Sequence, residues 1–218
     1  MSSSVGSSRW AGRCKGVRLA FERLVHGLFG NNVVLGRHIV RQLERMGAVA
    51  PPGFTGRRVD DLGCGDGRVT VLLGEILQPL SLRGFDINPA LVRRARSRGI
   101  EARIVDLEDC VPIGELAVLW GVLHHLSDPA RCLGRVRANY DRAFIREPIR
   151  QARPACFELG KPMRRSELSD LLRGSLPGCE LFDYEDCVLA FWESRKTVGA
   201  EHPAVACASV VSAGPRGR

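Results

Sequence analysis

The stretch RVDDLGCGDG (residues 58–67) decides the fold, because a short strand pattern containing acids runs directly into three glycines. Gly63, Gly65 and Gly67 form the pattern G-x-G-x-G. Glycines let the chain turn sharply after a strand, and they let a ligand lie against the main chain where a Cβ atom would collide. The stretch therefore predicts a strand, a nucleotide-type binding loop and the start of a helix.

The loop departs from the dinucleotide pattern G-x-G-x-x-G at two positions. Counted from Gly63, the last glycine of that pattern would fall on Arg68, and Asp66 would place a negative charge beside the phosphates. NAD is therefore disfavoured. An acid before the loop and another inside it favour a ligand that carries cationic groups and hydroxyls.

Two more acids follow predicted strands downstream. Residues 81–87 read as a short strand with Asp86 near its end, about 20 residues after the loop, where doubly wound folds place a carboxylate on a ribose diol. Residues 104–106 are expected to form a third strand that ends in Asp106. A single Asp at a strand end is often a cap or turn residue, but three at one edge of a sheet indicate a binding site.

These motifs resemble the class I S-adenosylmethionine-dependent methyltransferases, in particular the small-molecule branch related to quinone-biosynthesis methyltransferases. The resemblance covers roughly residues 55–195, and its most specific part is AVLWGVLHHLSDP, residues 117–129. It implies that S-adenosylmethionine is the cofactor, with its amino-acid end at Asp61 and the glycines, its ribose at Asp86 and its adenine edge at Asp106. The cofactor residues implied by the resemblance are Asp61, Gly63, Cys64, Gly65, Gly67, Asp86, Ile87, Asp106, Leu107, Trp120 and Gly121.

One position leaves the cofactor contact undecided. Asp60 stands where the resembling family usually has an apolar residue, next to the motif acid Asp61. Successive side chains of a strand point to opposite faces, so only one of the two acids is expected to face the cofactor.

The order of predicted elements indicates an α/β fold. Strands and helices alternate and end in a hairpin at 180–184 and 188–193, which predicts a three-layer, Rossmann-like sandwich with a mostly parallel sheet of seven strands. The resemblance implies the strand order 3-2-1-4-5-7-6 with strand 7 antiparallel. The expected organisation is a disordered amino terminus at 1–16, a helical cap at 17–54, the cofactor-binding methyltransferase domain at 55–196 and a flexible tail at 197–218.

Composition limits the partners and the location. No apolar run reaches about 18 residues and no apolar signal region starts the chain, so we expect a cytoplasmic protein without a membrane partner. The net charge is +8, but only three of the 32 basic residues are lysines and no aromatic residues interleave them, so nucleic acid is an unlikely partner. The eight cysteines form no C-x-x-C pair, and we expect no metal site.

Candidates for chemistry lie after the predicted fourth and fifth strands. His124 or His125 could act as a general base, because imidazole titrates near neutral pH, and Glu147 is a comparable candidate. The alternatives are a capping or packing role for the histidines and a salt-bridged strand end for Glu147. Arg146 and Arg150 could bind an anionic acceptor through their planar guanidinium groups, or they could be ordinary solvated arginines.

The resemblance predicts methyl transfer from S-adenosylmethionine to a small-molecule acceptor, with an anionic acceptor as the sharper hypothesis. The N/D-P-P-Y tetrapeptide that grips a flipped base does not follow the predicted strand at 117–120. Two alternatives stay open, an RNA or protein methyltransferase and a catalytically silent cofactor-binding subunit of a complex. A monomer and a homodimer are both compatible with the sequence.

Overall fold

The computed structural model describes residues 33–51, 54–150 and 160–194, with only the backbone for residues 33–39. The predicted disordered terminus, the first part of the predicted cap and the predicted tail lie outside these ranges. The chain divides into two compact units, Met1–Arg41 and Gln42–Arg218, and the second unit holds the sheet. The predicted domain boundaries stay predictions.

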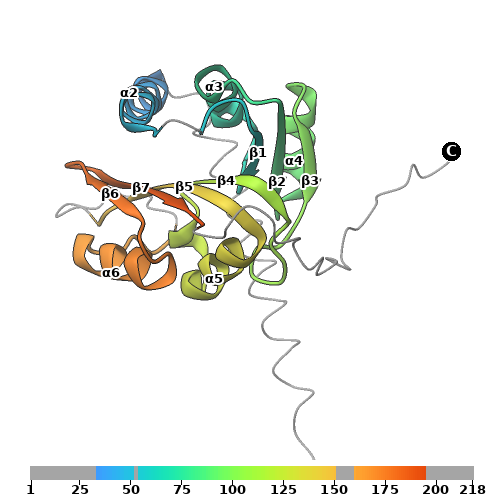
Figure 1. Cartoon of the computed structure of the whole chain (residues 1–218). Coiled ribbons are helices and arrows are strands. Elements are labelled where there is room, and N and C mark those ends of the chain that lie inside the picture. The colour runs from blue at the N-terminus through green and yellow to red at the C-terminus, as the bar shows by residue number, and fades with distance from the viewer. Residues whose placement is uncertain (1–32, 52–53, 151–159, 195–218) are drawn as a thin grey trace, which may run out of the picture. The chain divides into compact units, whose positions relative to one another are not determined.

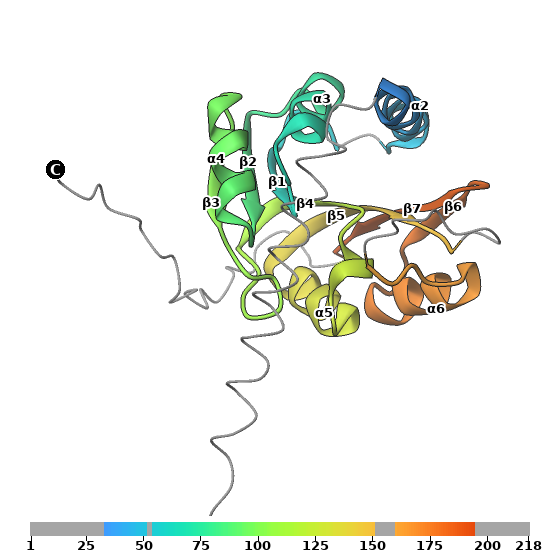
Figure 2. The same cartoon turned by 180° about the vertical axis from the view of Figure 1, so that it is seen from behind.

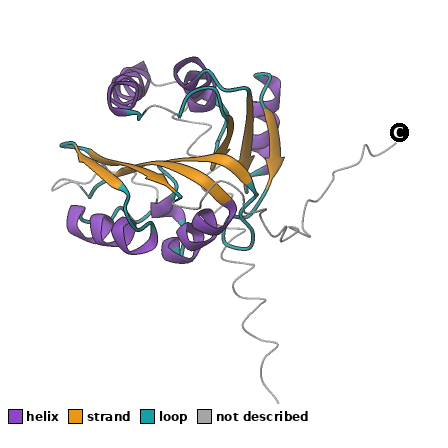
Figure 3. Cartoon of the chain, in the orientation of Figure 1, coloured by secondary structure: helices purple, strands orange, loops and turns teal. Residues whose placement is uncertain are grey.

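Strands and helices alternate along the second unit, as Figures 1 and 3 show. Helix α2 runs across the boundary between the units, and its buried residues Leu43 and Met46 belong to the second. The elements in chain order are α2 (Val33–Val49), β1 (Arg58–Leu62), α3 (Arg68–Leu77), β2 (Ser81–Asp86), α4 (Pro89–Ser97), β3 (Glu101–Ile104), β4 (Gly114–Trp120), the 3-10 helix η1 (Leu123–His125), α5 (Pro129–Asn139), β5 (Tyr140–Pro148), α6 (Arg165–Ser175), β6 (Glu180–Asp183) and β7 (Cys187–Glu193).

The sheet has seven strands in the order β3-β2-β1-β4-β5-β7-β6. Strand β7 pairs antiparallel with both β5 and β6, and the other neighbours are parallel. The predicted sheet, its strand order and its antiparallel seventh strand are therefore confirmed. In this arrangement the carboxyl ends of β1, β2, β4 and β5 meet at one edge, which is where ligands bind in open α/β sheets.

Helices cover both faces of the sheet, as the two opposite views show (Figures 1 and 2). Helices α5 and α6 bury the main hydrophobic cluster, to which strand β5 contributes Ala143 and Ile145. The intervening residue Phe144 packs against Phe191 on the opposite face, with ring centroids 4.8 Å apart. Alternation along β5 therefore sends Arg146 to the same face as Phe144, and Glu147 toward the α5 and α6 side.

The third strand begins and ends earlier in the chain than predicted. Strand β3 ends at Ile104, which pairs with Asp86, the last residue of β2. The Val105 amide still donates a hydrogen bond of 3.1 Å to the Asp86 carbonyl, but β2 ends there. The expected bounds of 104–106 were therefore wrong, and Asp106 lies in the loop after β3. None of the described helices is long and apolar enough to cross a membrane.

Candidate functional site

The glycine loop between β1 and α3 takes a backbone conformation that favours glycine. Gly63, Gly65 and Gly67 have φ angles of 87°, 56° and 83°. A Cβ atom at Gly63 would lie 2.5 Å from Cγ2 of Val122, and one at Gly67 would lie 3.0 Å from Cα of Ala95. At Gly65 nothing lies within 4 Å of that position. Two of the glycines therefore allow close packing, whereas the middle one leaves open space beside the main chain.

Asp61 is a buried acid with one oxygen still open. Its side chain faces α3, where Oδ2 accepts a hydrogen bond of 2.6 Å from the Thr70 hydroxyl, and Oδ1 has no hydrogen-bond partner. The pKa of Asp61 is raised to about 7: burial is the main cause, the Thr70 hydrogen bond opposes it, and the nearby Asp86 adds a smaller upward effect. A cation placed beside Oδ1 would supply the missing partner and favour the ionised carboxylate.

Asp60 points to the opposite face and is fully engaged. Its carboxylate accepts hydrogen bonds of 2.7 and 2.6 Å from Arg83 and one of 2.8 Å from the Tyr140 hydroxyl. Burial, followed by the charge of Asp60, raises the pKa of Tyr140 well above its usual value, so the phenol stays a neutral donor. Of the two neighbouring acids, Asp61 is thus the one with an oxygen to offer a ligand.

Asp86 joins the glycine loop to the start of the next helix. It is the last residue of β2, and its two oxygens accept hydrogen bonds from the backbone amides of Gly65 (3.0 Å) and Asn88 (2.7 Å). The Asn88 side chain in turn caps α4 by accepting a hydrogen bond from the Ala90 amide. Asp86 is therefore fixed in place beside the loop, 21 residues from Gly65.

Four other predicted cofactor residues, Asp106, Leu107, Cys64 and Ile87, differ in how deeply they are buried. Asp106 is half-buried in the loop after β3 and accepts a hydrogen bond from the Glu108 amide. The side chain of Leu107 belongs to the main hydrophobic core. Cys64 packs over Gly84, where a Cβ atom would lie 2.8 Å from its sulfur, and burial raises the pKa of its thiol. Leu107 and Cys64 thus contribute to the core, and Ile87 is half-buried directly after Asp86.

Glu147 is a buried acid near the carboxyl end of β5, and both of its oxygens accept hydrogen bonds or contact a ring nitrogen. Oε1 accepts hydrogen bonds from the amides of Val122 (2.5 Å) and Leu123 (2.6 Å), which begin helix η1. Oε2 lies 2.8 Å from Nδ1 of His124, and the Glu147 side chain is fully buried. The carboxylate therefore fixes both the backbone of η1 and the ring of His124.

His124 is held from a second side by the chain before α6. The Lys161 amide donates a hydrogen bond of 2.7 Å to the His124 carbonyl oxygen. A Cβ atom at Gly160, whose φ is 92°, would lie 2.5 Å from Cδ2 of the His124 ring. The His125 ring lies against that of His124, with centroids 4.0 Å apart. Sequence reasoning did not find Gly160, because a glycine in a loop carries no signal of what it touches.

The two arginines proposed for the acceptor differ sharply. Arg146 is only 8% exposed, and its guanidinium lies 5.7 Å from the centroid of the Trp120 ring. Arg150 is exposed, and its Nε donates a hydrogen bond of 3.1 Å to the Pro162 carbonyl. Arg146 is therefore buried beside Trp120, whereas Arg150 contacts the chain before α6, and the acceptor role of both stays a prediction. Within the described ranges, no group of three His, Cys, Asp or Glu side chains could hold a metal ion.

Comparison with known proteins adds three kinds of similarity. A family model described as "Methyltransferase domain" matches residues 35–154. A trans-aconitate 2-methyltransferase of Mycolicibacterium gilvum (strain PYR-GCK) is 28% identical over 178 residues, which are 73% of this chain and 67% of that protein. Another of Rhodococcus jostii (strain RHA1) is 40% identical over 77 residues, which are 35% of this chain but only 28% of that protein.

The fold is also similar to that of solved structures. The magnesium protoporphyrin IX methyltransferase of Synechocystis PCC 6803, determined with bound SAH, has a TM-score of 0.59 at 16% identity. That similarity covers 80% of this chain and 94% of the other. At this low identity it concerns the fold alone.

Proposed function

Because the chain belongs to the methyltransferase-domain family, we propose that it transfers the methyl group of S-adenosylmethionine to a small-molecule acceptor. The family match covers more than half of the chain, and it confirms the predicted class I S-adenosylmethionine-dependent methyltransferase resemblance. The relatives named above support a small-molecule acceptor, because trans-aconitate is a small carboxylic acid. The observation that carries the proposal is the fully buried Asp61, whose Oδ1 has no partner beside the glycine loop.

The residues around the loop suit the parts of S-adenosylmethionine. Asp61 Oδ1 would accept a hydrogen bond from the ammonium group, and Asp86 would accept hydrogen bonds from the ribose hydroxyls. Gly65 leaves the main chain open on the side where a Cβ atom would stand. Asp106 remains the predicted partner of the adenine edge. The cofactor supplies a methyl group that is activated by the positive charge of the sulfur.

On the acceptor side, the geometry favours a positioning role for Glu147. Its two oxygens bind the η1 amides and Nδ1 of His124, so none is directed to an acceptor. In the neutral imidazole, an Nδ1–H that donates to Glu147 leaves the lone pair on Nε2. His124 would then take a proton at Nε2 from a hydroxyl acceptor, and it would only help to position an acceptor that is already ionised.

Calorimetry with S-adenosylhomocysteine tests the cofactor site. The wild-type protein should bind one equivalent per chain. Asp86→Ala removes the acceptor of two charge-assisted hydrogen bonds, so we expect its affinity to fall at least about a hundredfold. Asp183→Ala is the matched control, because Asp183 also ends a strand but is exposed and pairs with Arg165. Equal affinities of the Asp86 variant and the wild type would remove Asp86 from the site.

A labelling experiment distinguishes the acceptor classes. The protein is incubated with S-adenosylmethionine labelled in its methyl group and with a cell extract divided into small molecules, RNA and protein. Label in the small-molecule fraction supports the proposal. Label in the RNA or protein fraction favours that alternative, and binding of S-adenosylhomocysteine without label in any fraction favours the catalytically silent subunit.

A further inference from the structure

Arg146 is a buried charge without a countercharge. Its side chain is 8% exposed, and no described carboxylate forms an ion pair with its guanidinium. Its buried Nε has no hydrogen-bond partner. The contacts it does make are with the Trp120 ring and the Cys187 thiol. Burial raises the pKa of Cys187, so this thiol stays neutral and does not offset the charge.

The acids next in sequence to Arg146 and to its contact Cys187 have other partners. Glu147, the next residue along β5, faces the other side of the sheet and binds His124. Asp186, next to Cys187, accepts hydrogen bonds from Gln42 and Arg45. A buried ion without a partner costs several kcal/mol. The fold therefore keeps Arg146 in a state that a bound anion would stabilise.

Arg146 and His124 both approach the main chain at Gly121. Gly121 follows Trp120 with a φ of 67°. A Cβ atom built on it would lie 3.6 Å from Nη1 of Arg146 and 3.7 Å from Cε1 of His124. Gly121 thus leaves free the space that a side chain would take between the guanidinium and the imidazole.

We infer that Arg146 is the acceptor-binding residue of this site and that it holds a carboxylate group of a small organic acid beside His124. This inference rests on the proposed function and specifies its substrate class. The planar guanidinium can donate two parallel hydrogen bonds to one carboxylate, and Trp120 provides a wall against which the group lies. Such a contact would select acids over neutral compounds of the same shape, because only an anion removes the cost of the unpaired charge.

The test measures acid binding to the protein saturated with S-adenosylhomocysteine. The probes are trans-aconitate, other small mono-, di- and tricarboxylic acids, and the methyl ester of each acid. We expect at least one acid to bind about tenfold or more tightly than its ester. Arg146→Met should weaken that acid by a similar factor and leave S-adenosylhomocysteine binding within about twofold. Arg146→Lys should retain part of the affinity, because it keeps the charge but not the planar fork.

Arg142→Met is the matched control. Arg142 lies on the same strand and face, at the opposite end of β5, and pairs with Glu193. This variant should bind the acid as the wild type does. Arg146→Met should also melt no earlier than the wild type without ligands, because it removes an unpaired buried charge. A purely structural role predicts a lower melting temperature instead.

The outcomes separate this inference from the proposed function. If S-adenosylhomocysteine itself does not bind, the proposed function fails. If it binds but no acid is preferred over its ester, or if Arg146→Met binds the acid as well as the wild type, the assignment of Arg146 is overturned and the cofactor site stands.

Discussion

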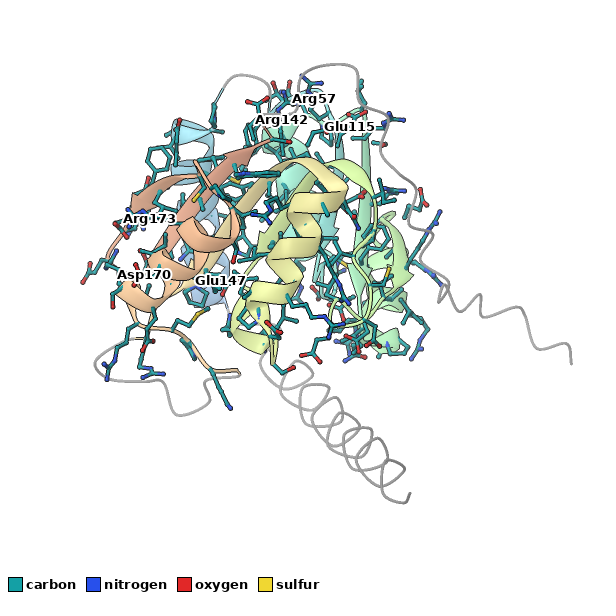
Figure 4. All side chains as sticks on the ribbon, turned by 60° about the horizontal axis from the view of Figure 1, so that its bottom comes forward. Arg57, Glu115, Arg142, Glu147, Asp170 and Arg173 are labelled. Atoms are coloured by element: carbon teal, nitrogen blue, oxygen red, sulfur yellow. The ribbon has the colours of Figure 1, made fainter. Side chains whose placement is uncertain are left out.

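The two edges of the sheet treat charge in opposite ways. At the amino edge, arginines pair with acids near solvent, as Arg58 does with Glu115 and Arg142 with Glu193. At the carboxyl edge, Asp61 and Arg146 are buried, and neither forms an ion pair with another described residue. Figure 4 shows Arg142 and Glu115 at one end of the sheet and Glu147 at the other.

Strand β5 makes the contrast within one element. Arg142 and Arg146 lie on the same face of β5, because their positions in the strand differ by an even number of residues. Only Arg142 has an acid opposite it, Glu193 on strand β7. If only stability determined the residues of this sheet, both arginines would be expected to have an acid as a partner. The difference teaches that the charges at the amino edge are neutralised within the free protein, whereas the carboxyl edge holds buried charges that a ligand of opposite charge would neutralise. Three predictions test this contrast.

The largest effect on stability is expected at Glu147, the carboxylate at the carboxyl edge whose two oxygens already have partners. Glu147→Ala leaves the amides of Val122 and Leu123 and the His124 ring without their acceptor. We expect the free energy of unfolding to fall by about 3 kcal/mol or more, measured by urea denaturation. Glu193→Ala, at the exposed amino edge, should cost less than about 1 kcal/mol. Equal losses in the two variants would contradict the contrast between the edges.

A second variant separates stability from positioning. Glu147→Gln keeps an oxygen for the two amides but presents an NH₂ group to His124, which inverts the donor and acceptor roles at Nδ1. It should be much more stable than Glu147→Ala. If His124 acts through Nε2, the same variant should change the pH profile of methyl transfer, and a profile like that of the wild type would reduce Glu147 to a structural residue.

The next effect is the pH dependence of cofactor binding through Asp61. Because the pKa of Asp61 is raised to about 7, the free protein binds a proton there that the unfolded chain holds only below the ordinary value of 3.8. Its contribution to stability is therefore present in acid and is lost as the pH rises through 7. The ammonium group of S-adenosylhomocysteine is expected to bind the ionised carboxylate of Asp61. Affinity for S-adenosylhomocysteine should therefore fall by up to about tenfold per pH unit below 7.

Asp61→Asn checks this linkage. The variant cannot ionise, so its affinity and its free energy of unfolding should both lose the dependence on pH between about 4 and 7. Calorimetry and urea denaturation at several pH values provide the two measurements. If the variant kept the full pH dependence of the wild type, the titration would have to be assigned to another group.

The smallest effect is expected at the amino edge, at Glu115. Its pKa is lowered by hydrogen bonds from the Arg58 backbone and side chain. The associated stability is present above the ordinary pKa of 4.5 and is lost as the pH falls through the lowered value. Because Arg58 is largely exposed, Glu115→Gln should cost only about 0.2 to 1 kcal/mol in urea denaturation, and added salt should reduce that cost. If Glu115→Gln lowered the free energy of unfolding by more than this, and salt did not change the loss, the interpretation that solvent screens the charges at this edge would be wrong.

The sequence predicted what depends on local pattern. The glycine loop, the helix that begins after it and the acid at the end of β2 all follow from spacing and residue type. The strand order was confirmed as well, but it came from the family resemblance. The end of β3 was missed, because pairing with β2 rather than the local sequence sets where that strand stops.

Features that depend on distant contacts could not be predicted. Alternation showed that only one of Asp60 and Asp61 faces the cofactor side, but the choice depends on Tyr140, 80 residues away from Asp60, and on Thr70. Arg146 looks like many other arginines in the sequence, and only its burial and missing countercharge distinguish it. Likewise, the role of Glu147 depends on amides that belong to a different loop.

The strand order also determines which strands lie at the two edges of the described sheet. Strands β3 and β6 form the two open edges of the sheet, and each has only four residues. Strand β3 carries Glu101 and Arg103, and β6 begins with Glu180 and ends with Asp183. Short strands with charged side chains are poor templates for pairing with a second chain. Growth of the sheet from copy to copy is therefore disfavoured, and a homodimer would have to use a surface other than these edges.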